Sequence, residues 1–247
     1  DRFLINPWGW HWSEITASSL VLCDRDGKVL EGDNEVEPTA MFIHARVHQK
    51  APQARCVMHT HMPHALALCV VDGARLEMTE QNALRFHDRI SYDDRYNGLA
   101  LDNSEGDRIA HALGNRSIAF LANHGVVVVG QSVAETFDDL YYLERACKVQ
   151  VLARSIGTMR KVDPQVVEKT AQQIAGEKAQ CYRHFDALKR ILDREGQVDR
   201  FYKKLSVRQT YVEQQKAKEE LKGSPERPIE ELGLASRAVE ALKTAGI

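Results

Sequence analysis

The chain has 247 residues, with 33 lysines and arginines against 35 aspartates and glutamates, so its formal net charge is −2. This balance excludes the strongly basic surface by which proteins bind nucleic acid or an anionic membrane. Apolar residues make up 43% of the chain, as is ordinary for a globular protein in water, and no apolar run approaches the ~20 residues of a membrane span.

The first part of the chain is predicted to form short strands and turns. Strands are expected at residues 3–5, 20–23 and from 29 onward, with an Asp-Gly hairpin turn at 26–27 and a helical turn capped by Ser13. Trp8, Trp10 and Trp12 fall within five positions of one another. They are predicted either to line a substrate pocket or an interface, or to pack locally around the turn.

Short helices and strands then alternate up to residue 130. Helices are expected at 38–50, 64–71, 83–86 and 104–113, the last capped by Ser104, and strands at 55–60, 89–92, 118–121 and 126–129. From residue 133 the pattern is helical, with helices at 133–156, 164–194 and 206–222 and a linker at 223–228. We therefore predict an α/β domain over residues 1–160, with helices on the faces of a sheet, and a helical C-terminal extension over 161–247.

The five cysteines are scattered, with no Cys-x-x-Cys pair: Cys23, Cys56, Cys69, Cys147 and Cys181. An odd, dispersed set argues against a disulfide framework and is typical of a reducing compartment. No signal peptide is recognisable, so we expect a cytoplasmic protein. The chain opens directly into an apolar run, and we expect N-terminal residues of the domain to precede Asp1.

The stretch Cys56-Val-Met-His-Thr-His61 carries the main chemical signal. In a β-strand, His59 and His61 project on the same side, where two imidazoles are able to share a metal ion. Two partly buried polar residues are the alternative interpretation, because two imidazoles alone do not complete a site. His124 is the best candidate for a third ligand, since it stands beside Gly125 between two apolar runs. Gly125 is expected to permit an unusual backbone conformation there.

A second histidine pair, His44 and His48, lies four residues apart on the helix expected at 38–50 and so shares a face. Such a pair is able to bind metal, but no His-Glu-x-x-His motif surrounds it. We therefore favour packing or polar contacts for these two side chains.

Several ordered motifs resemble the class II aldolase/adducin head-domain family over about residues 1–155. They are Phe3-Leu-Ile-Asn-Pro-Trp-Gly9, Trp12 to Leu20, Ile43-His-Ala-Arg-Val-His48, Cys56 to His61, Asn123-His-Gly-Val-Val-Val-Val-Gly130, Val133 to Phe137 and Tyr141 to Ala146. The resemblance implies a three-layer α/β/α sandwich around a mostly antiparallel sheet. It also implies a divalent metal, zinc first and iron or manganese as alternatives, held by His59, His61 and His124. A homotetramer is implied as well.

The chain departs from the sugar-phosphate aldolases of that family at their catalytic glutamate. Alignment on His44 places Ala40 at that position, and alignment on Pro38 places Met41 there; neither side chain carries a proton. The phosphate-binding serines of those enzymes reduce to Thr39. The sequence is therefore closer to an adducin-like branch without the glutamate, and a sugar-phosphate substrate is not expected.

The sequence thus predicts a metal-dependent lyase acting on a small carbonyl or hydroxy substrate, by aldol-type cleavage, decarboxylation or dehydration through a metal-stabilised enolate. Glu80 and Tyr92 are the predicted catalytic residues, with Glu14, His64 and Tyr141 as further candidates. Trp8, Trp10, Trp12 and Thr39 are predicted to bind substrate. One alternative is an Fe(II)-dependent non-haem oxygenase on the same three histidines. Another is a non-catalytic, adducin-like oligomerisation module; neither nucleic acid nor a membrane is an expected partner.

Overall fold

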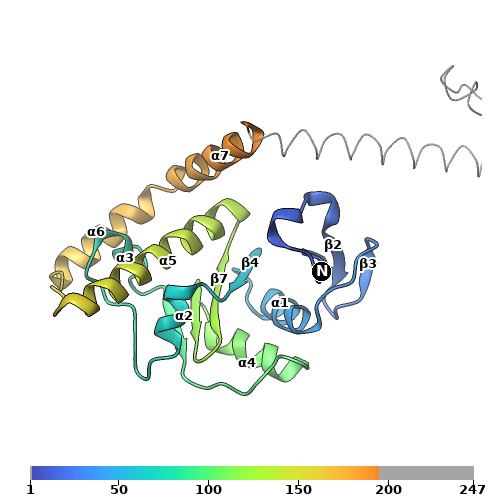
Figure 1. Cartoon of the computed structure of the whole chain (residues 1–247), viewed down its shortest axis with the longest axis horizontal. Coiled ribbons are helices and arrows are strands. Elements are labelled where there is room, and N and C mark those ends of the chain that lie inside the picture. Colours follow the sequence, from blue (N-terminus) through green and yellow to red (C-terminus); the bar gives the residue numbers. More distant parts are fainter. Residues whose placement is uncertain (1, 195–247) are drawn as a thin grey trace, which may run out of the picture. The chain divides into compact units, whose positions relative to one another are not determined.

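A four-stranded sheet forms the centre of the molecule. The computed structural model describes residues 2–194 (Figure 1). The strands β4 (Cys56–Thr60), β5 (Ile90–Asp93), β6 (Ile118–Leu121) and β7 (Gly125–Gly130) lie in the order β4-β7-β6-β5. The β4–β7 and β6–β7 pairs are antiparallel, and the β5–β6 pair is parallel. The predicted mostly antiparallel sheet is therefore confirmed, with one parallel edge strand.

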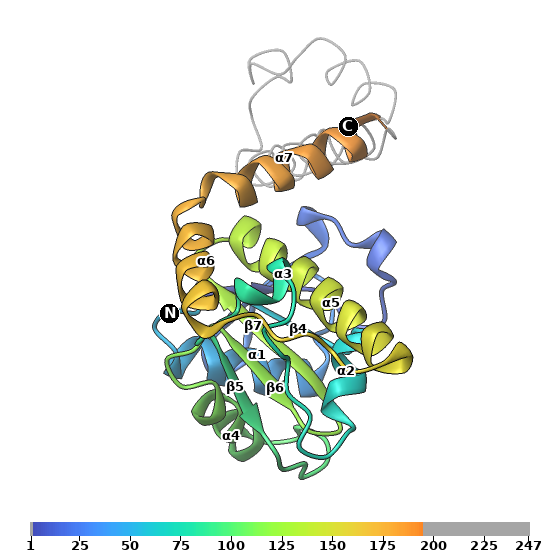
Figure 2. The same ribbon diagram turned by 90° about the vertical axis from the view of Figure 1, so that its left-hand side faces the viewer.

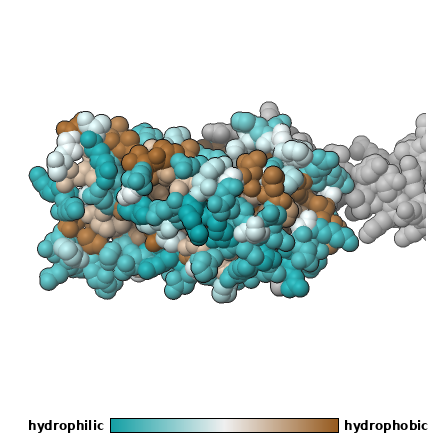
Figure 3. All heavy atoms as spheres, turned by 90° about the horizontal axis from the view of Figure 1, so that it is seen from below, coloured by the Kyte–Doolittle hydropathy of each residue, from teal (hydrophilic) through white to brown (hydrophobic). Residues whose placement is uncertain are grey.

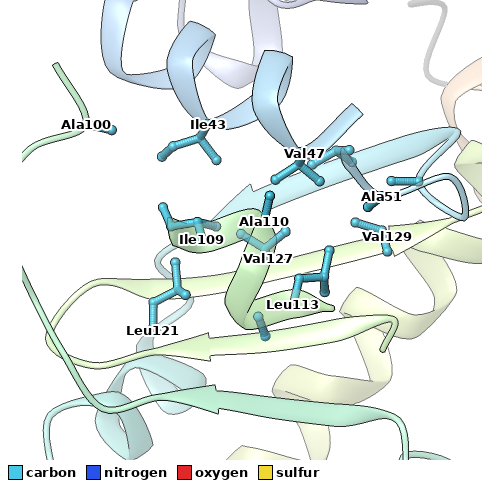
Figure 4. Packing of buried hydrophobic residues seen from close by; sticks show 13 residues of the cluster. Ile43, Val47, Ala51, Ala100, Ile109, Ala110, Leu113, Leu121, Val127 and Val129 are labelled. Atoms are coloured by element: carbon cyan, nitrogen blue, oxygen red, sulfur yellow. The ribbon is translucent and has the colours of Figure 1, made fainter. Parts of the chain in front are cut away.

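Both faces of this sheet are buried, because its central strands are apolar at every position. Ala119, Leu121, Val127 and Val129 point to one face, where they pack with Ile43 and Val47 and with Ile109 and Leu113 (Figure 4). Their neighbours in sequence, Ile118, Phe120, Val126 and Val128, point to the other face and pack with Leu68 and Leu143. This alternation is the period-two pattern of a strand covered on both sides.

Helices supply the two outer layers. They are α1 (Pro38–Lys50), α2 (Pro63–Cys69), α3 (Gln81–Leu84), α4 (Asn103–Leu113), α5 (Val133–Ile156), α6 (Pro164–Gly176) and α7 (Ala179–Arg194). The helices α1 and α4 cover one face of the sheet, and α2 and α5 cover the other (Figure 2). The α/β/α sandwich predicted from the sequence is confirmed.

A second, three-stranded antiparallel sheet precedes α1. It consists of β1 (Arg2–Ile5), β2 (Val21–Asp24) and β3 (Val29–Glu31) in that order. Ile5, Val21 and Cys23 pack against Met41 and Ala45 on α1. The predicted hairpin at the Asp-Gly turn is confirmed, and α1 is the element shared by the two sheets.

Three predicted details of the helices are wrong. The helix expected over 164–194 is broken after Gly176, where Glu177 leaves the helical conformation with ψ at 39°, so α6 and α7 are separate. Asp102, and not Ser104, caps α4, because its carboxylate accepts the N–H groups of Ser104 and Glu105. Likewise His11, and not Ser13, caps the 3-10 turn Trp12–Glu14. In both caps the preceding side chain reaches the free N–H groups of the first turn.

The described part of the C-terminal extension lies against the sandwich. On α7, His184 Nδ1 lies 2.7 Å from Asp138 Oδ1 on α5, and on α6 the Glu168 carboxylate lies 3.3 Å from His87 Nε2. The domain boundary at residue 160 stays a prediction. The predicted helix 206–222 and the linker 223–228 lie outside the described residues.

All five cysteines are free, in agreement with the prediction that no disulfide framework exists. Among the described helices, none is both long and apolar enough to cross a membrane. The face shown in Figure 3 is mostly hydrophilic, with separate hydrophobic patches. Exposed apolar side chains among the described residues include Trp8, Trp12, Leu99 and Leu101.

Candidate metal centre

The three predicted ligands His59, His61 and His124 come together at one end of the central sheet. His59 lies on β4 and His61 just after it, while His124 lies in the tight turn between β6 and β7. Antiparallel pairing of β4 with β7 places Thr60 opposite Val126, next to that turn. The ring centroids lie 4.7 Å (His59–His124), 5.0 Å (His61–His124) and 5.1 Å (His59–His61) apart. One nitrogen of each ring lies within 4.8 Å of the others.

Hydrogen bonding determines which nitrogen of His59 faces the cluster. Its Nδ1 lies 3.0 Å from the carbonyl oxygen of Val126, which only accepts, so Nδ1 carries the hydrogen. The lone pair is therefore on Nε2, which lies 3.3 Å from Nε2 of His61. A backbone carbonyl that fixes the tautomer of an imidazole in this way is a common feature of metal-binding histidines.

Two imidazoles of the cluster, those of His59 and His124, are held in the neutral form. Burial, together with the smaller effects of the neighbouring His124 and His44, lowers the pKa of His59 to about 3. Burial also lowers the pKa of His124, with smaller contributions from His61 and Arg108. A neutral imidazole is the form that binds a metal, since protonation occupies the lone pair.

The donor set fits a divalent metal ion. The Nδ1 atom of His124 is buried, and no group among the described residues hydrogen-bonds to it. A buried polar atom without a partner costs about 1–3 kcal/mol, a cost that ligation would remove. Three imidazoles with one exposed member, His61, also leave room for a further ligand, as in catalytic rather than structural sites.

Gly125 allows the close approach that brings His61 to the turn. A Cβ atom at this position would lie 2.5 Å from the carbonyl oxygen of Thr60 and 2.7 Å from Cδ2 of His61. The expectation of an unusual backbone at Gly125 is wrong: the left-handed residue of the turn is Asn123, with φ at 55°. The glycine is required by space, and the asparagine carries the strained conformation, which this residue type tolerates.

A buried charge cluster lies beside His124 and was not recognised in the sequence. Arg108 on α4 pairs with Asp93 at the end of β5 and with Glu105 one turn earlier on its own helix. Both carboxylate side chains are less than 10% exposed. The spacing of Asp93, Glu105 and Arg108 in the sequence matches no known motif. Only the packing of α4 beside β5 brings Asp93 to the helix.

The predicted catalytic residues Glu80 and Tyr92 are both engaged in other contacts. The Glu80 carboxylate caps α3, accepting the N–H groups of Asn82 and Ala83 at 2.8 Å each. The Tyr92 hydroxyl accepts the N–H of Leu76 at 3.0 Å, and burial raises the pKa of this phenol. Neither group belongs to the histidine cluster, and their catalytic role stays a prediction.

The role of Glu80 as the cap of α3 can be tested by mutation. Replacing Glu80 by alanine is expected to lower the free energy of unfolding by about 1 kcal/mol, the usual cost of losing an N-cap. Metal content is expected to stay unchanged. Urea unfolding and metal analysis check both, with Gln81→Ala, on the exposed neighbouring position, as the control. A loss of activity without the loss of stability would instead favour the predicted catalytic role.

The predicted substrate-binding residues lie in two places. Trp8, Trp10 and Trp12 are exposed, and within the described part of the chain their rings do not stack on the histidines of the cluster. Thr39, at the start of α1, donates a hydrogen bond to the Glu37 carboxylate. Their role in binding stays a prediction.

The positions that replace the family glutamate carry no titratable group in the structure. Met41 is buried, and its side chain lies against Gly27, while Ala40 packs at the edge of the same small core. The nearby carboxylate of Glu37 instead accepts the N–H of Ala40 as the cap of α1.

The two histidines of α1, His44 and His48, are not members of the cluster. His48 Nδ1 donates to the carbonyl oxygen of Ala54 at 2.8 Å, and its ring lies 5.1 Å from that of Phe3. Burial, and secondarily His48, lowers the pKa of His44 to about 4. These contacts agree with the interpretation of this pair as packing and polar residues.

Comparison with known proteins identifies relatives along most of the described chain. The model of the family described as "Class II Aldolase and Adducin N-terminal domain" matches residues 1–151. A Pseudomonas aeruginosa protein, provisionally named an aldolase class 2 protein, is 37% identical over 178 residues, which cover 71% of this chain and 68% of the relative. A 4-hydroxy-3-prenylphenylpyruvate oxygenase/4-hydroxy-3-prenylbenzoate synthase of Streptomyces roseochromogenus is 30% identical over 175 residues, covering 70% of this chain and 63% of that enzyme.

Two solved structures share the fold. An aldolase II superfamily protein from Pseudomonas syringae superposes with a TM-score of 0.72 at 34% identity, covering 78% of this chain and 79% of that one. An L-fuculose 1-phosphate aldolase from Glaciozyma antarctica superposes with a TM-score of 0.69 at 25% identity, covering 78% and 76%.

Proposed function

This chain belongs to the family of class II aldolase and adducin N-terminal domains, and from that premise we propose that it is a divalent-metal-dependent lyase. Its substrate is a small carbonyl or hydroxy compound that is not a sugar phosphate. The observation that carries the proposal is the convergence of His59, His61 and His124, three imidazoles with an unpartnered buried nitrogen among them.

His59, His61 and His124 would hold the ion, and zinc is the metal we propose, with iron or manganese as alternatives. When bound, a divalent ion supplies Lewis-acid polarisation of a carbonyl oxygen, which is worth several kcal/mol in reactions of this class. The Val126 carbonyl orients His59, and the exposed side of His61 leaves the site open to substrate. A cytoplasmic homotetramer is part of the same proposal.

The absence of a proton carrier at Ala40 and Met41 supports a substrate other than a sugar phosphate. With the family glutamate and serines replaced, this end of α1 offers Thr39 alone as a polar side chain, and its hydroxyl already donates to Glu37. Aldol-type cleavage, decarboxylation and dehydration all place negative charge on one oxygen, so each would use the same three histidines.

An Fe(II)-dependent oxygenase is the second candidate. The observation in its favour is the 30% identity, over 70% of this chain, to a Streptomyces protein named as an oxygenase. Imidazole ligands suit iron as well as zinc, so the ligand set does not separate the two reactions. The non-catalytic adducin-like role is the third, and the retention of all three histidines in one cluster speaks against it.

The experiment that separates these functions begins with the purified full chain, stripped of metal and loaded with zinc, manganese or, without oxygen, Fe(II). We expect the zinc or manganese form to release a 2-keto acid and an aldehyde from 4-hydroxy-2-keto acids, or carbon dioxide from β-keto acids, without oxygen uptake. Oxygen uptake by the iron form alone, with a 2-keto acid or a hydroxyphenyl acid, would establish the oxygenase instead. Failure to bind any of the three metals would leave the non-catalytic role.

A further inference from the structure

Tyr96 stands beside His124 of the histidine cluster. Its ring centroid lies 6.2 Å from that of His124, with the two planes 61° apart. The side chain is 46% exposed, so it is not a core residue. Of the tyrosines in the described part of the chain, it is the one whose ring contacts a histidine of the cluster.

The loop that carries this tyrosine is anchored on both sides by the buried charge cluster. On one side, Arg95 donates its N–H to Asp93 at 3.2 Å and accepts a hydrogen bond from Arg108 at 3.2 Å through its carbonyl oxygen. On the other side, the amide of Asn97 donates to Glu105 at 3.5 Å. A half-exposed aromatic ring is therefore held in place by its neighbours and not by its own burial.

Three of the other proton carriers predicted from the sequence are already hydrogen-bonded. The Tyr92 hydroxyl accepts the N–H of Leu76, and the Glu80 carboxylate caps α3. His64 Nδ1 lies 2.6 Å from Glu144, which also accepts the N–H groups of His64 and Ala65 at the start of α2. The hydroxyl of Tyr96 has no hydrogen-bond partner among the described residues.

We propose that Tyr96 is a catalytic residue of this site: its hydroxyl contacts the substrate held at the three histidines. There it donates a hydrogen bond to the substrate oxygen on which negative charge develops. A phenol donates and accepts, and a preorganised donor aimed at a developing negative charge is an effective catalytic group. The inference rests on the proposed function, and it assigns to Tyr96 the polar contact that Ala40 and Met41 do not provide.

The test uses oxalate, a dianion that mimics the planar, charged form of a 2-keto acid, as the probe. The full chain is loaded with one zinc ion, and oxalate binding is measured by calorimetry for the wild type, Tyr96→Phe and Tyr182→Phe. We expect Tyr96→Phe to bind oxalate about tenfold or more weakly, as expected for one lost hydrogen bond to a charged group. Zinc content, zinc affinity and melting temperature are expected to stay unchanged. Tyr182 on α7 is exposed to nearly the same extent, 45%, and its hydroxyl donates to Glu135, so its variant is expected to bind oxalate as the wild type does.

The possible results distinguish a failure of the role proposed for Tyr96 from a failure of the proposed lyase function. Equal oxalate affinity in the wild type and Tyr96→Phe overturns the role of Tyr96 and leaves the lyase proposal standing. A loss of zinc in Tyr96→Phe also overturns it, because the ring would then serve to hold His124. If the wild type binds no zinc, or binds zinc and no oxalate, the proposed function fails and the inference fails with it.

Discussion

Replacing His59 or His124 by alanine is expected to abolish the binding of one divalent ion per chain. Each residue contributes one of three nitrogens that lie within 4.8 Å of one another, so each variant leaves two ligands. Changes to groups that merely orient a metal ligand lower affinity by about 10–100-fold, and the loss of a ligand is expected to exceed that range. Metal analysis after dialysis, and titration against a chromophoric chelator, measure the change.

The exposed His111, on α4, provides the matched control. His111→Ala removes an imidazole from the surface and is expected to leave one ion per chain. The three-ligand interpretation would be wrong if His59→Ala or His124→Ala retained the wild-type metal content and affinity. It would also be wrong if His111→Ala lost the ion to the same extent.

Gly125→Ala is expected to lower both the stability of the domain and its affinity for metal. The added methyl group would lie 2.5 Å from the Thr60 carbonyl oxygen, which belongs to the backbone of β4, an edge strand of the four-stranded sheet, and has no rotamer to change. Overpacking of this kind costs about 1–3 kcal/mol, and a backbone contact places the cost near 3, or a fall of roughly 6–12 °C in melting temperature. His61, whose ring lies 2.7 Å from the same position, would be displaced from the cluster.

Gly176→Ala is the control for this prediction, because a Cβ atom at the end of α6 meets no atom within 4 Å. It is expected to leave the melting temperature and the metal affinity unchanged. Thermal unfolding of the metal-free proteins and zinc titration of each variant separate the two effects. A Gly125→Ala protein with wild-type stability would show that the turn relaxes, and that the close approach is not required.

A lyase and an oxygenase both remain candidate functions because the three metal-binding histidines do not determine the reaction. Three imidazoles bind zinc or iron with similar geometry, and the chemistry then depends on what surrounds the open side of the ion. In this chain Tyr96 lies beside His124, and the usual carboxylate is replaced at Ala40 and Met41. The side chains around the histidines, more than the histidines themselves, are expected to decide the reaction.

Local pattern was sufficient for most of the fold. The apolar runs at 118–121 and 126–129 predicted strands, and the structure shows both buried on two faces. Proline at the first position of α1 and glycine after α4 marked those helix ends. The sequence pattern predicted the helix-capping residue less well where two polar residues stand close together, as Asp102 and Ser104 do. Which of the two caps the helix depends on the backbone conformation of each residue.

For the site, the sequence by itself determined that His59 and His61 share one face of a strand, because side chains alternate with a period of two. It also marked His124 as a candidate, since an imidazole between two apolar runs needs a partner. Only the tertiary structure placed His124 within reach, through the antiparallel pairing of β4 with β7 across about 65 residues of chain. The same packing assigned Glu80 to a helix cap and brought Tyr96 to the cluster. Those contacts depend on how the chain packs in three dimensions. The local sequence pattern, which reflects only helix and strand periodicity, does not predict them.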